Sequence, residues 1–493
     1  MMINKFTAAV DLGSNSFRLQ VGRLIDHQIY PLDGLKETVR LAAGLTPDKL
    51  LDEPSQQRAL RALSIFSERL RGFAPDAVRA VATNTFRVAK NAAEFLQTAE
   101  ATLGFPIEVI SGREEARLIY LGVAHTLANP AQRQLVVDIG GGSTELIIGQ
   151  NNEPLALESL YMGCVSYSLR FFPQGRVSKS SFRAAELAAS QELQTLVNTY
   201  QSLGWDVAIG SSGTAKAIME LLLQNKLSEQ GISRNGLSRL CAELICAGDP
   251  SRMRVQGLRA DRLPVLPGGL AIMSAIFNVF DLEIMAFSEG ALRLGVLYDQ
   301  LDRYHHDDMR EVTVNRFMQR YEVDSRQANR VANTALNLLH QLVPATEEPD
   351  NVDAQFLVWA ARLHEVGVSV AHSSYHKHSA YILLNADMPG FSRRDQMRLS
   401  QLVLAHRGKL ERANSLGKDA SEWTLICCLR IAVLLHRVRD DLPLPTMKIR
   451  FTKSGFQLIF ADGGLADLPL TASALADETK QWQGVEGELR IKA

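Results

Sequence analysis

The sequence predicts an α/β protein whose first 300 residues form two related domains, followed by a helical region and a small β-containing tail. Apolar, strand-like runs alternate with amphipathic helical segments up to about residue 300. The segments VDLGSNSFRLQVG (10–22) and VDIGGGSTELIIG (137–149) align without a gap, which indicates an internal duplication. From about 313 to 440 the strand signals vanish and long helical patterns replace them.

The individual elements follow from periodicity and from turn residues. Strands are expected at 7–13, 107–110, 134–140 and 145–149, and helices at 56–73 and 92–104. A Pro-rich break at 440–446 precedes alternating residues at 447–460, which predict a β-hairpin. The predicted domains are residues 1–122, 123–303, 304–440 and 441–493.

Length and composition bound the class of protein. A chain of 493 residues is too long for one hydrophobic core. No apolar run approaches the roughly 20 residues that cross a bilayer, and the N-terminal segment lacks the pattern of a signal peptide. We therefore expect a cytoplasmic protein without a transmembrane segment, and leave peripheral association with a membrane open.

The net charge limits which binding partners are expected, and the cysteine content limits which metal sites and disulfides are expected. The formal net charge is −1, so a polyanion would have to be bound by a local basic patch, and nucleic acid is not an expected partner. The five cysteines show no metal-binding spacing. Cys427 and Cys428 are adjacent in a helical pattern, and we expect them to be buried and reduced.

The glycine-rich turn of the second motif suits phosphate and metal chemistry. Glycines at 140–142 allow positive φ angles and close approach of a ligand, and successive N–H groups in such a turn form a concavity for anions. Ser143 and Thr144 add hydroxyl donors, while Asp138 and Glu145 are carboxylates of the kind that hold hydrated Mg²⁺. The alternative is a plain hairpin turn, which is the more frequent case for an isolated motif.

Repetition favours a ligand site over a plain turn. The motif occurs again at 11–18, and a third turn, AIGSSGTAKAI (208–218), follows an apolar run and leads into a helical pattern. Neither the Walker A pattern nor G-x-G-x-x-G occurs. A P-loop protein and a Rossmann dehydrogenase are therefore not expected.

Eight segments that follow one another through residues 7–300 carry a more specific signal. They are AAVDLGSNSFRL, VATNTFRVAKNAAEF, VISGREEARLIYLGVAHT, LVVDIGGGSTELIIG, MGCVSYSLRFFP, AIGSSGTAKA, LSRLCAELI and SEGALRLGVLYDQL. Together they resemble the exopolyphosphatase / guanosine pentaphosphate phosphohydrolase family, within the superfamily of actin, sugar kinases and heat-shock-chaperone ATPases. The stretch at 363–391 also resembles the longer, four-domain bacterial members.

The resemblance implies a fold and a reaction. It implies two duplicated actin-like (ribonuclease-H-like) domains facing a cleft, then an all-α HD-like domain and a small α+β domain, in a homodimer. It also implies Mg²⁺-dependent hydrolysis of a terminal phosphoryl group, in which Glu115 activates the attacking water and Arg87 lies at the substrate cleft. At the same helix start, Ser111 and Glu114 fit a capping box, which leaves Glu115 without that local duty.

The predicted site residues fall into three groups. The catalytic residues are Glu115 and Arg87; the phosphate-binding residues are Gly13, Ser14, Asn15, Ser16, Gly140, Gly141, Gly142, Ser143, Thr144, Ser212, Gly213 and Thr214; the metal-binding residues are Asp11, Asp138 and Glu145.

The substrate stays open at the level of sequence. The favoured reaction is release of orthophosphate from the end of inorganic polyphosphate, and the alternative is conversion of guanosine pentaphosphate (pppGpp) to guanosine tetraphosphate (ppGpp), or both. A kinase would need an acceptor hydroxyl and a nucleotide pocket, which the third turn could serve. A binding protein without turnover is the remoter alternative, because Glu115, Asp138 and Glu145 occur together.

The helical region contains a second candidate site. LHEVG (363–367) resembles the HD-type phosphohydrolase signature with Glu365 in place of the aspartate, and His372, His376, His378 and His406 lie nearby. A metal site there is one interpretation, but a degenerate HD-like domain is favoured, because ligands must also meet a geometry. A basic set could line a channel for a long polyanion: Arg393, Arg394, Arg398, His406, Arg407, Lys409 and Arg412.

Overall fold

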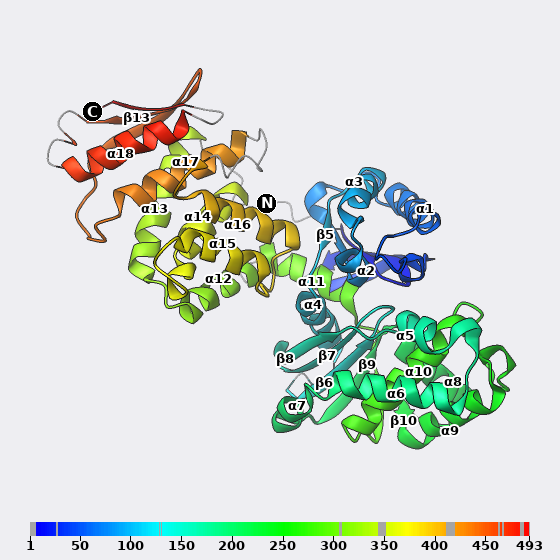
Figure 1. Ribbon diagram of the computed structural model, residues 1–493. Helices are drawn as coiled ribbons and strands as arrows, with labels where there is room; N and C mark the ends of the chain where they lie inside the picture. Colours follow the sequence, from blue (N-terminus) through cyan, green and yellow to red (C-terminus); the bar gives the residue numbers. More distant parts are fainter. Residues whose placement is uncertain are drawn as a thin grey trace. The chain divides into compact units, whose positions relative to one another are not determined.

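The chain forms two compact units, Met1–Asp308 and Met309–Ala493 (Figure 1). The computed structural model describes residues 6–25, 28–127, 129, 131–304, 308–343, 352–410, 420–461, 464–465, 468–483 and 488–492, with the side chains of 302–304 left out. The finer division into four domains remains our proposal. Among the described residues, no helix is long and apolar enough to span a membrane.

The first unit begins with a five-stranded sheet in the order β3-β2-β1-β4-β5. Its strands are β1 (Phe6–Leu12), β2 (Ser16–Ile25), β3 (Gln28–Thr38), β4 (Val78–Ala82) and β5 (Ile107–Val109). Its helices are α1 (Glu53–Arg69), α2 (Asn84–Val88), α3 (Ala92–Leu103) and α4 (Gly112–Ala124). Because β1 and β4 are parallel, their carboxyl ends meet at one edge of the sheet.

A six-stranded sheet follows, in the order β10-β11-β9-β6-β7-β8. Its strands are β6 (Gln134–Ile139), β7 (Thr144–Gln150), β8 (Glu153–Leu160), β9 (Val207–Ser211), β10 (Ile232–Ser233) and β11 (Ile284–Phe287). Its helices are α5 (Cys164–Phe171), α6 (Lys179–Leu193), α7 (Val197–Leu203), α8 (Ser212–Gln224), α9 (Arg234–Ala247), α10 (Leu266–Val279) and α11 (Leu292–Tyr304).

The two sheets repeat one topology, which confirms the duplication predicted from the sequence. The order β8-β7-β6-β9-β11 matches β3-β2-β1-β4-β5, with the same antiparallel and parallel pairings. The aligned motifs at 10–22 and 137–149 become the hairpins β1–β2 and β6–β7. The hairpin interpretation of the glycine turn was therefore correct as far as the backbone is concerned.

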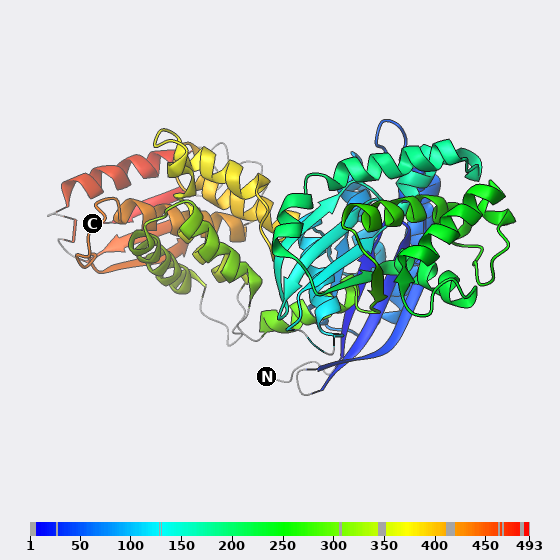
Figure 2. The ribbon, with the colours of Figure 1, turned by 90° about the horizontal axis from the view of Figure 1, so that it is seen from below.

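Figure 2 shows helices beside the strands of the first unit. Alternating side chains of the central strand β6 face two different cores, one on each side of the sheet. Leu135 and Val137 of β6 pack into the core that includes residues of α5, α6, α8 and α10. Val136, between them, faces the core that contains Leu118 of α4 and Val296 of α11. Ala9 and Val81 of the first sheet join the same core, so α4 and α11 lie between the two sheets.

The second unit is mainly helical, as predicted. Its elements are α12 (Met309–Arg320), α13 (Ser325–Leu342), α14 (Val352–Leu363), α15 (Tyr375–Asn385), α16 (Arg393–Ala405), α17 (Ala420–Leu435), β12 (Met447–Thr452), β13 (Gly455–Phe460), α18 (Pro469–Trp482) and β14 (Glu488–Lys492). The predicted hairpin is β12–β13, and β14 adds a parallel strand. Cys427 and Cys428 are buried and reduced in α17, as expected.

Candidate active site

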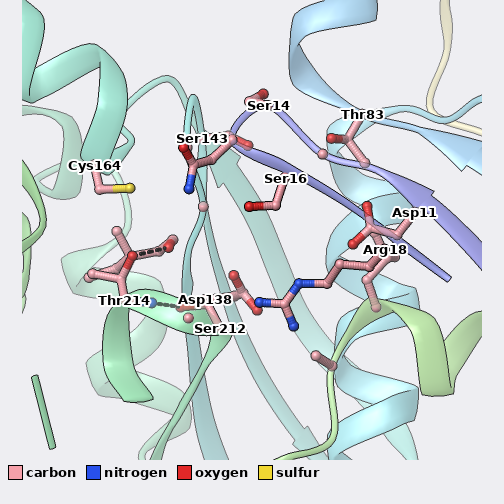
Figure 3. A pocket seen from close by; sticks show the side chains of 18 of the residues that line it. Asp11, Ser14, Ser16, Arg18, Thr83, Asp138, Ser143, Cys164, Ser212 and Thr214 are labelled. Atoms are coloured by element: carbon pink, nitrogen blue, oxygen red, sulfur yellow. Dashed lines mark hydrogen bonds between the residues drawn. The ribbon is translucent and has the colours of Figure 1, made fainter. Parts of the chain in front are cut away.

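A pocket opens at the carboxyl ends of β1, β4, β6 and β9, where the three glycine-containing turns meet (Figure 3). Ligands of parallel α/β sheets commonly bind beyond this end of the strands. The lining residues are Asp11, Gly13, Ser14, Asn15, Ser16, Arg18, Thr83, Glu115, Ile119, Asp138, Ile139, Gly140, Gly141, Ser143, Cys164, Ser212, Gly213, Thr214, Arg262, Ala291, Leu292 and Arg293. Most of the residues predicted for the site are therefore brought together.

The start of α5 fixes the turn between β6 and β7. The backbone N–H of Cys164 donates to Gly140 O, and that of Val165 donates to Gly141 O, both at 2.9 Å. A Cβ atom on Gly163 would overlap the backbone of Gly141, so only glycine permits this approach. The turn therefore sits against a helix N-terminus, whose partial positive charge favours anions nearby.

The turns of the two repeats face each other directly. A Cβ on Gly141 would lie 3.1 Å from the backbone N of Asn15, and a Cβ on Gly142 would lie 2.5 Å from Asn84 Oδ1. Glycine allows positive φ angles, but none of Gly13 and the glycines at 140–142 adopts one. These glycines matter because the opposing turn occupies the space that a side chain would need.

The third turn carries backbone strain beside the pocket. Ser212, the first residue of α8, has a φ angle of 80°, which is unfavourable for a residue with a side chain. Thr214 Oγ1 donates to Ile139 O at 2.9 Å, and Ser211 Oγ donates to Asp138 Oδ2 at 2.6 Å. The turn is thus tied to the end of β6, and it holds the carboxylate of Asp138 in one orientation.

Buried carboxyl groups gather beside these turns. Burial, reinforced by the neighbouring Glu115 and Asp11, raises the pKa of Asp138 to about 6, against the hydrogen bond from Ser211. Burial also raises the pKa of Asp11 to about 6, although Arg293 and Arg18 oppose the shift. Burial together with Glu115 and Asp138 raises the pKa of Glu145 well above its usual value. A cation bound among these carboxyl groups would offset the cost of burying their negative charge.

The carboxylates of the pocket suit a hydrated Mg²⁺ better than a metal ion held by protein side chains alone. Among the described residues, no group of three or more histidine, cysteine, aspartate or glutamate side chains is arranged to hold a metal ion. Mg²⁺, however, commonly takes one or two carboxylates and fills its other positions with water and substrate phosphate. Asp11 and Asp138 reach the pocket, whereas Glu145 lies behind the turn and accepts from Ser159 Oγ at 2.8 Å.

Glu115 enters the pocket from the first turn of α4. Ser111 caps this helix, since its Oγ accepts from Glu114 N at 3.1 Å. The Glu114 carboxylate binds Arg117 at 2.9 and 2.8 Å rather than completing a capping box. Glu115 itself accepts from Arg87 Nη1 at 2.8 Å, and Arg87 also donates to Ile110 O. The two predicted catalytic residues thus form an ion pair, and Glu115 is held although it has no capping role.

Three arginines that the sequence analysis did not select line the pocket. Arg18 comes from β2, Arg262 from the segment before α10, and Arg293 from α11. Burial, together with the charge of Arg18, lowers the pKa of Arg293 to about 10. Guanidinium groups held this close and partly desolvated favour bound phosphate. Arg18 aligns with Glu145 in the duplicated motif, and this was the signal that could have found it.

A second, basic pocket adjoins the first. It shares Arg18, Ser212, Gly213, Arg262, Ala291 and Arg293 with the first pocket, and adds Lys36, Lys216, Ala217, Glu220, Arg259, Phe287, Ser288 and Glu289. The two pockets therefore form one continuous surface with an acidic part at Asp11 and Asp138 and a basic part around the three shared arginines.

Sequence comparisons place the protein in a family. Residues 21–304 match the Ppx/GppA phosphatase family, and residues 309–479 match domain III of the Ppx/GppA phosphatases. The chain belongs to the Ppx/GppA phosphatase family. It is 38% identical over 489 residues to a guanosine-5'-triphosphate,3'-diphosphate pyrophosphatase of Vibrio vulnificus, covering 99% of this chain and 98% of that protein. A protein of the same name from Pseudoalteromonas translucida is 38% identical, with 96% of each chain covered.

Solved structures agree with this assignment. An exopolyphosphatase from Cytophaga hutchinsonii superposes with a TM-score of 0.56 at 25% identity, covering 60% of this chain and 98% of that one. The Aquifex aeolicus PPX-GPPA enzyme gives a TM-score of 0.51 at 25% identity, covering 59% of this chain and 98% of that one. The Ppx/GppA enzyme described here is thus a phosphatase with the actin-like fold, and it hydrolyses phosphoanhydride bonds.

Four predicted residues of the Ppx/GppA site do not line the pocket: Arg87, Gly142, Thr144 and Glu145. Thr144 Oγ1 donates to Met162 O at 2.6 Å, so its hydroxyl is engaged inside the fold. Arg87 pairs with Glu115, which lines the pocket. Glu145 lies near enough to Glu115 and Asp138 for their charges to raise its pKa. Their catalytic and metal-binding roles stay predictions.

The second unit brings part of the HD-like signature together. The rings of His364 and His406 lie 5.1 Å apart and those of His376 and His406 6.2 Å apart, between centroids. Glu365 pairs with Arg439, and His372 is exposed while His378 is half-buried. Within the described part of this unit, no three histidine, cysteine, aspartate or glutamate side chains are grouped so as to hold a metal ion.

The proposed basic channel of the second unit needs correction. Arg398 binds Glu422 at 2.6 Å and Asp353 at 2.5 Å, so its charge is already compensated inside the unit. Arg407 lies over the ring of Tyr375, 4.8 Å from its centroid. Arg412 lies outside the described residues. Arg398 was therefore assigned wrongly, because sequence spacing does not reveal an ion-pair partner on another helix.

Proposed function

We propose that this Ppx/GppA phosphatase removes the terminal 5′-phosphate of pppGpp, giving ppGpp and orthophosphate, with Mg²⁺ as cofactor. This was the alternative at the level of sequence, where polyphosphate was favoured. Curated relatives that match over nearly their whole length are named for guanosine-5'-triphosphate,3'-diphosphate. The relative named exopolyphosphatase matches over 60% of the chain.

The observation that carries the proposal is the pair of adjoining pockets. A guanosine pentaphosphate carries a triphosphate and a separate diphosphate on one ribose. The first pocket combines glycine turns and carboxylates for the reacting triphosphate. The second adds Lys36, Lys216 and Arg259 to the three shared arginines, which suits a second phosphate group at a fixed distance from the first.

The chemistry follows from the groups that surround the terminal phosphate. Glu115 would orient a water molecule and take its proton at a carboxylate oxygen, while the water oxygen forms the new bond to phosphorus. The bond between phosphorus and the bridging oxygen then breaks, and the nucleotide departs with the electron pair. When bound at Asp138 and Asp11, Mg²⁺ would neutralise charge on the phosphate oxygens. Arg87 orients the Glu115 carboxylate through their 2.8 Å contact.

The first experiment compares substrates. Orthophosphate release should be measured from pppGpp, GTP and long polyphosphate, each with and without Mg²⁺ and without any acceptor. We expect kcat/KM for pppGpp to exceed that for the other two by about tenfold or more, since one extra charge-assisted contact contributes about 1.5–3 kcal/mol. A preference for polyphosphate would restore the first hypothesis, and release that is independent of Mg²⁺ would overturn the cofactor.

Variants separate chemistry from recognition. Glu115→Gln should lower kcat about 100- to 10,000-fold, as expected for loss of a general base, while pppGpp binding persists. The exposed Glu94→Gln serves as its control.

Lys216→Ala should raise KM for pppGpp but leave KM for GTP unchanged, because GTP lacks the 3′-diphosphate. Equal effects on both nucleotides would contradict the assignment of the second pocket. The homodimer stays a prediction, to be checked by the mass of the protein in solution.

A further inference from the structure

Asp299, on α11, is the centre of a buried ionic network outside both pockets. Its Oδ2 accepts from Arg79 Nη1 and its Oδ1 accepts from Arg117 Nη2, each at 2.5 Å. The side chain of Asp299 is 4% exposed, and those of Arg79 and Arg117 are 5% and 6% exposed. Arg79 also binds Glu108, and Arg117 binds Glu114, so the network joins two guanidinium groups to three carboxylates.

This network joins the helix that carries Glu115 to two neighbouring elements. Arg79 belongs to β4, Arg117 to α4, and Asp299 to α11. A buried ion pair is weak evidence for stability, because well-packed apolar side chains of similar volume are often as stable. Stability alone therefore does not explain this network, and we looked to the geometry of the helices for its role. Arg117 follows Glu115 by two positions on the same helix, which supplies a geometric reason for the network.

The backbones of α4 and α11 touch where they cross. A Cβ on Gly122 would overlap Ala291 O, and a Cβ on Gly295 would overlap Leu118 O. Side chains do not interdigitate at this point, so glycines alone set the register of the two helices weakly. The bond between Arg117 and Asp299 is the directional contact that opposes sliding. Near its start, α11 also carries Arg293, which lines the pocket with Glu115.

We propose that Asp299 is a positioning residue, which fixes α4 on α11 through Arg117 and so sets the place of Glu115 relative to the phosphate-binding residues. The inference rests on the proposed role of Glu115 as general base. Asp299 itself touches no substrate atom. A displacement of about 1 Å at a catalytic group can cost about 100-fold in rate, so a modest shift of α4 would be measurable.

The test is Asp299→Asn, which keeps the shape and removes the charge. We expect kcat to fall about 10- to 100-fold with KM for pppGpp within about twofold, because the phosphate-binding turns belong to other elements. Glu478→Gln is the matched control: Glu478 pairs with Arg430 in the second unit at 7% and 3% exposure. The control should lower the melting temperature comparably and leave kcat intact.

A second background decides whether Asp299 acts through Glu115. In Glu115→Gln protein, adding Asp299→Asn should lower kcat no further, because the group being positioned has already lost its function. A full additive loss would overturn the positioning role, and so would a rise in KM at unchanged kcat. If Glu115→Gln alone retains turnover, the proposed base is wrong, whereas normal kcat in Asp299→Asn with an inactive Glu115→Gln rejects the present inference alone. Should Asp299→Asn not fold, Arg117→Lys gives the graded version.

Discussion

The two repeated hairpins share a backbone and differ at the residues that meet the substrate. In β1–β2, Asp11 lies opposite Arg18, and in β6–β7, Asp138 lies opposite Glu145 at the same register. One copy therefore sets a cation beside its aspartate, and the other sets a second carboxylate. The duplicated motif therefore carries opposite charges at this position, a guanidinium in the first hairpin and a carboxylate in the second.

The turns differ in a complementary way. Gly13 and Gly140 are equivalent, and a Cβ on either would lie 3.0 or 3.1 Å from the carbonyl of Ser16 or Ser143. The next positions are Ser14 and Asn15 in the first turn but Gly141 and Gly142 in the second. Side chains of one turn occupy the space that the other leaves, which is why two copies of one motif can face each other at short range.

The largest effects are expected when the charges that distinguish the two hairpins, those of Arg18 and Glu145, are removed one at a time. Arg18→Gln should raise KM for pppGpp about 10- to 100-fold, because a charge-assisted contact to phosphate is lost. Glu145→Gln should leave that KM unchanged but raise the Mg²⁺ concentration for half-maximal rate about tenfold, the lower end of the loss expected for a residue behind a metal site. Steady-state kinetics across both concentrations separates the two effects.

The matched control for this pair is Arg113→Gln, a half-exposed arginine that lies 3.6 Å from Glu158 outside the pocket. Arg113→Gln should change neither KM for pppGpp nor the Mg²⁺ concentration for half-maximal rate. If Arg18→Gln altered the Mg²⁺ requirement and Glu145→Gln altered KM for pppGpp, the roles given to Arg18 and Glu145 would have to be exchanged.

A smaller effect is expected from filling the space between the turns. A Cβ on Gly142 would lie 2.5 Å from Asn84 Oδ1, so Gly142→Ala must displace the buried side chain of Asn84 at the start of α2. We expect a loss of about 1–3 kcal/mol in the free energy of unfolding, as for other overpacked sites, and a fall in kcat/KM. Urea unfolding and initial rates measure both. The double variant with Asn84→Ala should recover most of the loss; a fully active and equally stable Gly142→Ala would show that Asn84 moves aside without cost.

The smallest effect concerns pH. Folding raises the pKa of Asp11 and of Asp138 from 3.8 to about 6, through burial. The folded protein therefore binds these protons more tightly than the unfolded chain. The contribution of both groups to stability is greatest below about pH 4, falls as the pH rises, and levels off above about pH 6. Mg²⁺ should stabilise the ionised form, so it should raise the melting temperature at about pH 7.5 more than at about pH 5.

Asp138→Asn is the variant that checks the origin of this dependence. It should flatten the fall in stability between about pH 4 and about pH 6 and should weaken stabilisation by Mg²⁺. Equal stabilisation by Mg²⁺ at both pH values, in the parent protein, would separate the cation from these carboxyl groups.

Local pattern was sufficient for most of the fold. The aligned motifs predicted both hairpins because strand alternation and turn residues are local signals, and the β12–β13 hairpin followed from the same kind of evidence. The turns of the site were found for the same reason. Sequence could not show that their glycines serve contact between domains, since that depends on which turn lies opposite.

Long-range charge pairing was beyond the sequence. Arg262 and Arg293 reach the pocket from segments far from the motifs, and arginine has no spacing signal of its own. The pairing of Arg87 with Glu115 likewise joins two segments that only folding brings together. Arg398 was misassigned for the same reason, because its partners Asp353 and Glu422 lie on other helices.

The glycine crossing of α4 and α11 has a mechanical consequence. Each helix lies at a connection between the two domains of the first unit, and Thr126 Oγ1 and Ser288 Oγ, just beyond the crossing, lie 2.8 Å apart. Two helices whose backbones touch without intervening side chains can pivot about that contact, whereas sliding would require breaking the bond between Arg117 and Asp299. Any opening of the cleft should therefore be a hinge rotation about this crossing rather than a shear between packed layers.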